Sequence, residues 1–484
     1  MKPQSRILTA IEALKRGHRR DAAALLEQEL REGEPVGQRW ASVAKLAMKI
    51  GEIDMAVDAS RRFAFTPPVA LTAIVGHCGT LAQVGRSDEA IALLDTLPQD
   101  AQRHPAVLHF RATIASESGD FERAEALLRR SIEADGAQPQ AWFALAMLKT
   151  FDAQDSDFDA MVQLEDRVAR GEPATHARFT YGLAKALVDQ GRVEEGFAAY
   201  ARGAAIRRSL EPYDRERQER FVEALMEDFD EAAFKKLTPS RFEGQRAIFV
   251  NGLPRSGTTL VESILVAHSR VSEGAEVNLM RPALIPAGDT SFTQALAYQE
   301  HSSSEDPWGD VARDYHHMLA VRFPGDGLIV DKTLSQSMIM GLLLHAMPEA
   351  KVVWMRRRAE DSALSSYRSY FTSPVSWSWA WEDIAHQFRL EDRLFAHWVR
   401  LFPDRILPIA YETLVREPEE QTAKIIGHVG LEPEDGLLDF HRNARKVRTA
   451  SVQQVRSAIT TDAVGKADRF ADHLAAFRRA YSGE

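Results

Sequence analysis

A glycine recurs at a fixed interval through the first part of the chain, at positions 17, 51, 85 and 119, which are 34 residues apart. An alanine follows each of them five positions later, at 22, 56, 90 and 124. A repeat of this length corresponds to one pair of helices. Such pairs must stack on one another, because a single pair cannot bury its apolar face. We expect the glycine to allow close approach of the two helices and the alanine to allow tight packing of the second. The first part of the chain is therefore predicted to be an α-solenoid.

The 34-residue period with these small residues resembles the tetratricopeptide repeat. The pattern degenerates around residues 151–159 and returns at Gly191, with Gly196 in the alanine position. A solenoid of this kind offers a concave surface that suits a peptide or a partner protein. Turn-forming residues near Pro239 mark a joint, so we predict a repeat domain over residues 1–236 and a second domain over residues 237–484.

The bulk composition limits the function classes. A chain of 484 residues exceeds what one core usually organises, which also favours two domains. The net charge of −10 argues against a general nucleic-acid binder. Cys78 is the single cysteine, so no intrachain disulfide can form. The first residues lack the apolar core of a signal peptide, and no window is long and apolar enough for a membrane span. These features predict a cytoplasmic protein.

A phosphate-binding loop is predicted at residues 251–259. A short apolar strand, 247–250, runs into a glycine-rich loop, and an apolar helical pattern follows. In this order the loop's N–H groups and the helix N-terminus favour a bound anion. Thr258 stands where an ATPase carries its lysine, and Arg255 is the cation inside the loop. The loop therefore suits an anion whose transferring group carries less charge than a γ-phosphate. A nucleotide kinase and an interaction scaffold with an inactive nucleotide-binding domain remain as alternatives.

The sequence PRSGTT after a strand, with LVESIL following, resembles the phosphosulfate loop of sulfotransferases that use 3′-phosphoadenosine 5′-phosphosulfate (PAPS). The resemblance is to the tyrosylprotein sulfotransferases and to bacterial sulfotransferases with tetratricopeptide repeats. It implies a P-loop-type three-layer α/β/α domain with a parallel sheet, and PAPS as co-substrate without a metal. It also assigns the phosphosulfate to a set of loop residues: Arg255, Ser256, Gly257, Thr258 and Thr259.

The resemblance further assigns the groups that act on the acceptor and the leaving group. A glutamate 21 residues beyond the loop arginine is the family's base, which is Glu276 here; Glu273 is the nearby competitor. Removing the acceptor's proton needs such a carboxylate. Lys332 follows an apolar strand, as in the family, and would neutralise charge on the bridging oxygen as the S–O bond breaks. Leu334 stands where the family usually has proline.

A second anion site is expected after the strand 351–355. The family pairs an arginine with a serine eight residues on to hold the 3′-phosphate, and Arg357 and Ser365 have that spacing. Arg358 departs from the family pattern, so it stays open which arginine of 356–358 binds the phosphate. The resemblance also places three later residues at the nucleotide: Tyr411, Ser451 and Lys466.

Together, these motifs and the resemblance predict that the protein transfers a sulfuryl group from PAPS to a hydroxyl, or less readily to an amine. The acceptor stays open among a peptide, a carbohydrate and a small molecule. The repeats are expected to bind either this acceptor or a separate protein partner on their concave face.

Overall fold

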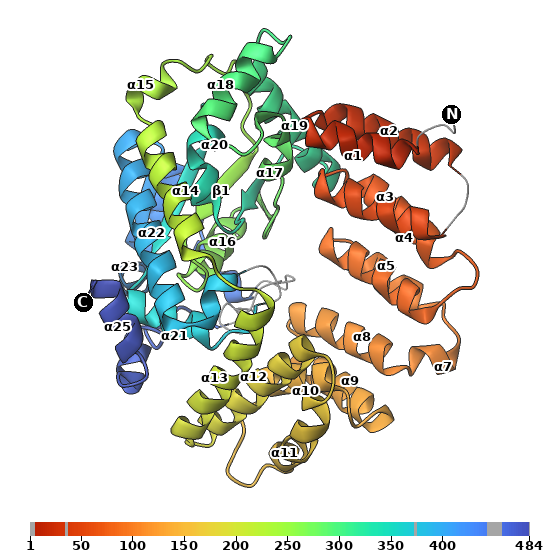
Figure 1. Cartoon of the computed structure of the whole chain (residues 1–484). Helices are drawn as coiled ribbons and strands as arrows, with labels where there is room; N and C mark the ends of the chain where they lie inside the picture. Colours follow the sequence, from red (N-terminus) through yellow and green to blue (C-terminus); the bar gives the residue numbers. More distant parts are fainter. Residues whose placement is uncertain (1–4, 34–36, 372–374, 443–456, 484) are drawn as a thin grey trace.

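The computed structural model describes residues 5–33, 37–371, 375–442 and 457–483. A curved array of helices forms one part of the molecule, and a parallel sheet with helices on both faces forms the other (Figure 1). The helices of the array are α1 (Arg6–Lys15), α2 (Arg19–Glu32), α3 (Gly37–Lys49), α4 (Ile53–Ala64), α5 (Leu71–Gln83), α6 (Ser87–Asp95), α7 (Gln99–Gln102), α8 (Pro105–Glu117), α9 (Phe121–Ala134), α10 (Pro139–Leu148), α11 (Ser156–Ala169), α12 (Pro173–Asp189) and α13 (Val193–Leu210).

The repeating alanines and glycines have different roles. All four alanines lie on the second helix of a pair and are completely buried, as expected. The glycines lie in the turn between the paired helices, where each has a positive φ between 79° and 98°. Our expectation that they serve helix–helix approach is corrected by this position: glycine is needed for the left-handed turn. Gly191 has the same geometry, with φ of 79°.

The second part contains a five-stranded parallel sheet in the order β2-β3-β1-β4-β5. Four of the strands, β1, β3, β4 and β5, lie where apolar stretches of the sequence predict strands. The sequence did not predict β2. The bounds are β1 (Ala247–Asn251), β2 (Val271–Glu273), β3 (Leu328–Asp331), β4 (Lys351–Arg356) and β5 (Ile406–Ala410).

Alternate residues of β1 point to opposite faces of the sheet, as strand geometry requires. Ala247 and Phe249 belong to a core with α14 (Arg215–Asp228), α19 (Pro307–Arg322), α20 (Met340–Ala346) and α22 (Trp381–Leu401). Ile248 and Val250 belong to a core with α16 (Thr258–Val266) and α24 (Pro418–His428). The three-layer α/β/α prediction is thereby confirmed. The helices around the sheet are α14 (Arg215–Asp228), α15 (Glu231–Phe234), α16 (Thr258–Val266), α17 (Met280–Ala283), α18 (Phe292–His301), α19 (Pro307–Arg322), α20 (Met340–Ala346), α21 (Ala359–Tyr367), α22 (Trp381–Leu401), α23 (Tyr411–Arg416), α24 (Pro418–His428) and α25 (Ala475–Ser482), with short 3₁₀ helices η1 (Ile285–Ala287), η2 (Gln336–Ile339), η3 (Ser376–Trp379), η4 (Leu437–Arg442) and η6 (Lys466–Phe470).

The first repeat pairs pack against α19 of the second part (Figure 1). Arg20 of α2 donates to Asp314 with 2.9 Å between Nε and Oδ1. The turn glycine Gly51 lies against Met318, whose Sδ would overlap a Cβ at position 51. The contact therefore combines an ion pair with close packing at a residue that has no side chain.

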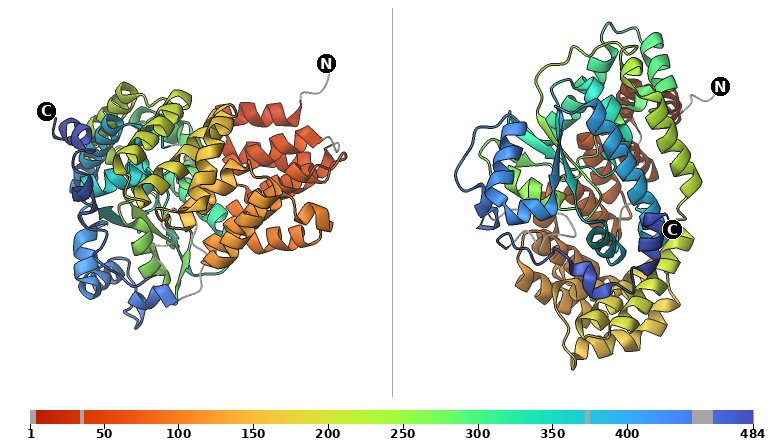
Figure 2. Two further views of the ribbon diagram at one scale, coloured as in Figure 1. Left: turned by 90° about the horizontal axis from the view of Figure 1, so that it is seen from below. Right: turned by 90° about the vertical axis from the view of Figure 1, so that its left-hand side faces the viewer.

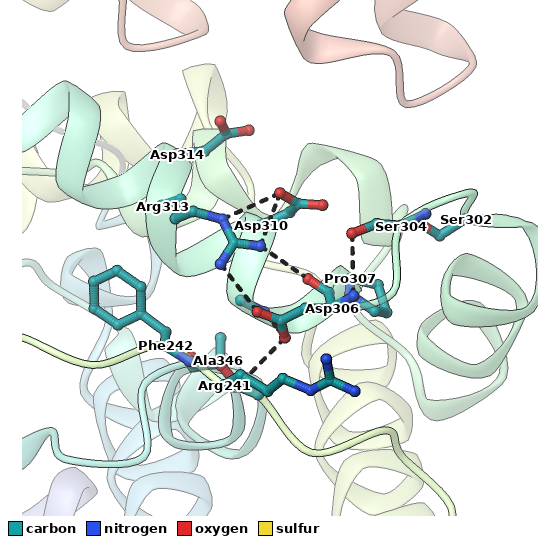
Figure 3. A network of polar contacts seen from close by, with 12 residues as sticks. Arg241, Phe242, Ser302, Ser304, Asp306, Pro307, Asp310, Arg313, Asp314 and Ala346 are labelled. Carbon is teal, nitrogen blue, oxygen red and sulfur yellow. Dashed lines mark hydrogen bonds and ion pairs between the residues drawn. The ribbon is translucent and has the colours of Figure 1, made fainter.

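A polar network fixes the same helix to the segment that leads into β1 (Figure 3). Asp306 caps α19 by accepting from Gly309 N–H at 3.0 Å, and it also accepts from the backbone N–H of Arg241 at 3.1 Å. Arg313, two turns along the helix, donates to Asp306 with 2.9 Å between Nη1 and Oδ2. The segment after α15 is thus tied to the helix on which the first repeats dock.

The last repeat helices share a core with the second part. Tyr181 of α12 packs edge-on against Trp379 of η3, with ring centroids 5.8 Å apart, and against Tyr370 at 5.5 Å. Buried residues from α8 to α13 form one cluster with buried residues of α21, η3, α22, η6 and α25. The array therefore contacts the sheet domain at both of its ends, and the views of Figure 2 agree with this closed arrangement. The boundary between residues 236 and 237 stays a prediction.

Candidate functional site

All five strands run parallel, so their carboxyl ends meet at one edge of the sheet. Functional groups of open α/β sheets gather at this edge. Each strand is followed there by a residue that the sequence singled out: β1 by Arg255, β2 by Glu276, β3 by Lys332, β4 by Arg357 and β5 by Tyr411.

The loop after β1 leads directly into α16, whose first two residues are the buried Thr258 and Thr259. Gly257 precedes the helix with φ of 101°. A Cβ at this position would lie 2.6 Å from Cδ2 of Tyr411, so only glycine lets the aromatic ring lie against the loop. The first N–H groups of α16 have no acceptor within the helix, as at any helix N-terminus, and they provide the anion-binding end.

Two arginines converge on this loop. Arg255 donates from Nε to Oγ of Ser365 at 2.8 Å. Arg357 donates from Nη1 to the carbonyl oxygen of Arg255 at 3.0 Å, and its guanidinium lies 4.5 Å from the centre of the Tyr411 ring. Burial, together with the neighbouring Arg357, lowers the pKa of Arg255 to about 10. The loop thus holds concentrated positive charge, which an anion would compensate.

A cavity of about 210 Å³ lies beside these groups and brings most of the predicted nucleotide residues together. Ser365 and Ser256 are not among the lining residues. The Oγ of Ser256 is buried and has no hydrogen-bond partner among the described residues. The predicted residues that line the cavity are Arg255, Gly257, Thr258, Thr259, Arg357, Tyr411 and Lys466; Leu260, Val415, Phe440 and residues 457–460, 462 and 463 complete the lining.

The three consecutive arginines at the end of β4, Arg356 to Arg358, have different partners. Arg356 forms an ion pair with Asp392, and Arg358 forms ion pairs with Asp468 and Glu360. Arg357 donates to two carbonyl oxygens, those of Arg255 and Ala463, and its buried Nε has no hydrogen-bond partner among the described residues. Of the three, Arg357 is the one that lines the cavity.

Lys466 reaches the cavity from the C-terminal segment, as the first residue of η6. Asp361, a buried residue of α21, fixes this turn by accepting from the N–H groups of Gly465 and Ala467, each at 2.8 Å. The predicted Ser451 lies outside the described residues. The nearby wall of the cavity, from Ser457 to Ala463, carried no motif and was missed by sequence reasoning.

Glu276 and Lys332 lie around a buried carboxylate that sequence reasoning also missed. Glu262 of α16 is completely buried, and its Oε1 accepts from the N–H of Ala275 at 3.0 Å. Its Oε2 lies 3.7 Å from Nζ of Lys332, which is itself 3% exposed. The backbone N–H of Lys332 donates to the carbonyl oxygen of Ala275 at 2.9 Å. One side chain therefore fixes both the turn before Glu276 and the lysine.

The surroundings of Glu276 alter its titration. Burial raises the pKa of its carboxyl; Lys332 acts in the opposite direction, and the carboxylates of Glu262 and Asp331 raise it further. A general base works best when its pKa approaches the working pH, so the raised pKa of Glu276 suits proton removal. Glu273 ends β2, where its register partner is Val330. Neither glutamate lines the cavity described above.

Comparison with known proteins identifies the two parts. Residues 247–435 match the family model described as "Sulfotransferase family", and residues 105–130 match a tetratricopeptide repeat model. The sulfotransferase match covers all five strands of the sheet and the loops that carry Arg255, Glu276, Lys332, Arg357 and Tyr411. The tetratricopeptide match covers α8 and most of α9 in the array in front of it.

Two relatives and one solved structure are similar to parts of this chain. An uncharacterized protein of Aquifex aeolicus is 26% identical over 407 residues, which cover 80% of this chain and 52% of that protein. The chain thus spans about half the length of this relative. A Caenorhabditis briggsae protein described as "putative protein-tyrosine sulfotransferase" is 25% identical over 46% of this chain and 81% of its own length. A solved sulfotransferase domain from the curacin biosynthetic pathway is 16% identical with a TM-score of 0.33, covering 50% of this chain and 98% of that one.

Over the described ranges, no group of three or more His, Cys, Asp or Glu side chains is placed to hold a metal ion. No helix in the same ranges combines the length and the apolar character needed to cross a bilayer.

Proposed function

We propose that this protein transfers a sulfuryl group from PAPS to a hydroxyl group of an acceptor. The observation that supports this most is the convergence of Arg255 and Arg357 with the start of α16 on one cavity. Two guanidinium groups and a helix N-terminus in one place fit a ligand with two separate anionic groups. PAPS is such a ligand, with its 5′-phosphosulfate and its 3′-phosphate.

The residues present fit the nucleotide at each of its parts. The N–H groups at the start of α16, with Arg255, Thr258 and Thr259, would hold the phosphosulfate, and Ser451 is proposed to join them. Arg357 would hold the 3′-phosphate, because its buried Nε has no hydrogen-bond partner among the described residues and needs an acceptor. The Oγ of Ser365 orients Arg255 and would reach the same phosphate. Tyr411 and Lys466 complete the nucleotide contacts from the cavity wall.

When bound, PAPS supplies a sulfuryl group on its 5′-phosphate; transfer joins that group to the acceptor oxygen and releases 3′,5′-ADP. Glu276 is proposed to take the acceptor's proton. Lys332 would offset the negative charge that grows on the bridging oxygen. Glu262 keeps this lysine and the turn before Glu276 in place, so both groups are oriented before substrate binds.

The repeats are proposed to recruit a protein, either the acceptor itself or a partner. Their array contacts the sheet domain at both ends, through Arg20–Asp314 and through Tyr181–Trp379. A molecule held on the inner side of the array would therefore lie on the side of the sulfotransferase domain. The acceptor class remains a choice among peptide, carbohydrate and small molecule.

Incubation with [³⁵S]PAPS and fractionated lysate tests the proposal. Labelled product and 3′,5′-ADP should form together, and Glu276→Gln should slow the formation of both by about 10²–10⁴ while the protein still binds 3′,5′-ADP. If label is transferred equally by wild type and by the variant, the assigned site is wrong. If the wild type transfers no label and does not bind 3′,5′-ADP, the proposed function is wrong.

A further inference from the structure

A cleft on the repeat array, remote from the sulfotransferase site, carries a concentration of arginines. It encloses about 400 Å³ between α7, α8 and α9. No carboxylate is among its lining residues, although the whole chain has a net charge of −10. The lining residues are Gln99, Gln102, Arg103, Leu108, Arg111, Arg123, Ala126, Leu127 and Arg130.

The arginines are presented by fixed helices. Arg123 and Arg130 lie seven residues apart on α9, so they project from the same face, two turns from one another. Arg111 comes from α8 and is paired with Asp95. The opposite wall, α7, is held to the preceding turn by Gln102, whose Nε2 donates to the carbonyl oxygens of Asp95 and Leu97 at 3.1 and 2.8 Å.

Three of the four guanidinium groups, those of Arg103, Arg123 and Arg130, form no ion pair and no side-chain hydrogen bond with any residue that the structure describes. All three residues are exposed. Their neighbour Arg129 differs, because it pairs with Glu125 and Asp157. Between the charged groups, the floor of the cleft is apolar and consists of Leu108, Ala126 and Leu127.

We propose that this cleft binds an acidic segment of a partner protein, with carboxylates on the arginines and an apolar side chain on the floor. Guanidinium groups pair with carboxylates through fork-shaped, charge-assisted contacts. A long polyanion such as a nucleic acid fits less well, since acidic residues flank the cleft on the same helices: Asp100, Glu122 and Glu125. A short segment can pair with the arginines without meeting that repulsion.

The cleft is separate from the nucleotide site. Figure 1 places α7 at the side of the array turned away from the strands. Occupation of the cleft therefore leaves the cavity beside α16 accessible, and the inference does not depend on sulfuryl transfer.

Fluorescence anisotropy on the full chain tests the inference, with a labelled peptide Glu-Glu-Leu-Glu-Glu-Leu-Glu as probe. Wild type should bind it and release it as salt is raised, while the peptide with Gln in place of Glu should not bind. Arg123→Gln with Arg130→Gln should weaken binding about tenfold. The matched control is Arg167→Gln with Arg170→Gln, two exposed arginines at the end of α11, which should leave affinity unchanged. Binding of 3′,5′-ADP should be the same in all variants.

Three results would overturn the inference. They are an absence of peptide binding to wild type, an equal loss in the control variant, and tighter binding of a single-stranded oligonucleotide than of the peptide through the same two arginines. The last result would assign the cleft to nucleic acid.

Discussion

Glu262 and Lys332 form a buried ion pair that joins α16 to the end of β3, with 3.7 Å between Oε2 and Nζ. The carboxylate also accepts from the N–H of Ala275, so the pair connects the phosphate loop helix, the turn that carries Glu276 and the strand that presents the lysine. A buried charge without its partner is costly, which makes this pair a fixed part of the site and gives it measurable consequences.

Glu262→Gln should keep the hydrogen bond from Ala275 but lose the charge. Lys332 would then be buried without its ion-pair partner, so the free energy of unfolding should fall by about 3 kcal/mol. The pKa of Glu276 should fall as well, because a negative charge that raises it is removed. Urea unfolding and the acid side of the kcat–pH profile measure the two effects. Glu262→Asp keeps the charge, so it should recover part of the lost stability and part of the change in the pKa of Glu276. If Glu262→Gln and Glu262→Asp behave equally, the charge is not the cause.

Glu276→Gln should retain nucleotide binding and lose about 10²–10⁴ in turnover. In wild type the rate should fall with decreasing pH, since the base must be unprotonated. The fall should occur at a higher pH than for an ordinary glutamate, because burial raises the pKa of this one. Glu273→Gln is the control, three residues away, and should change little. A large loss in the control with none at position 276 would move the base to Glu273.

Arg357→Ala should reduce affinity for 3′,5′-ADP and leave affinity for 5′-AMP nearly unchanged. A charge-assisted contact contributes about 1.5–3 kcal/mol, which corresponds to at least a tenfold change in Kd. Arg358→Ala is the matched control, because that arginine is paired with Asp468 and Glu360. Calorimetry with both nucleotides measures the difference. If Arg358→Ala instead removes the preference for 3′,5′-ADP, the phosphate is held by the neighbouring arginine.

Gly51→Ala and Gly191→Ala separate turn strain from interdomain packing. Both glycines have similar positive φ, 82° and 79°, so each alanine should cost about 1 kcal/mol in the turn. A Cβ at position 51 also meets the buried Met318, whereas one at position 191 meets nothing within 4 Å. Gly51→Ala should therefore destabilise the protein by about 1 kcal/mol more in urea unfolding. Equal losses would mean that the first repeats do not pack on α19 in solution.

The sequence allowed the parallel sheet and its loops to be predicted where strands are long and apolar, as at 247–250 and 351–355. It did not reveal β2, because three residues carry no periodicity and only the pairing with β3 defines them. Glu262 was missed for a related reason. Inside LVESIL a single glutamate reads as the solvent side of a helix, and its burial depends on Lys332 and Ala275, which are distant in sequence.

The contact of the repeats with the sheet domain was also beyond sequence reasoning. The turn glycines are explained by their own φ, and nothing local indicates that Gly51 additionally faces Met318. Trp379, one of three alternate tryptophans at positions 377, 379 and 381, packs against Tyr181 of the last repeat helices. Which face they would cover could not be deduced, since it depends on the curvature of the whole array.

Titration calorimetry of wild type with 3′,5′-ADP, 5′-AMP and ATP–Mg²⁺ tests the central claim most directly, because it needs no knowledge of the acceptor. The convergence of Arg357 and the start of α16 on one cavity predicts that 3′,5′-ADP binds at least about tenfold more tightly than 5′-AMP. ATP–Mg²⁺ should bind more weakly than 3′,5′-ADP. Equal affinity for 3′,5′-ADP and 5′-AMP, or a preference for ATP–Mg²⁺, would contradict the assignment of this site to PAPS.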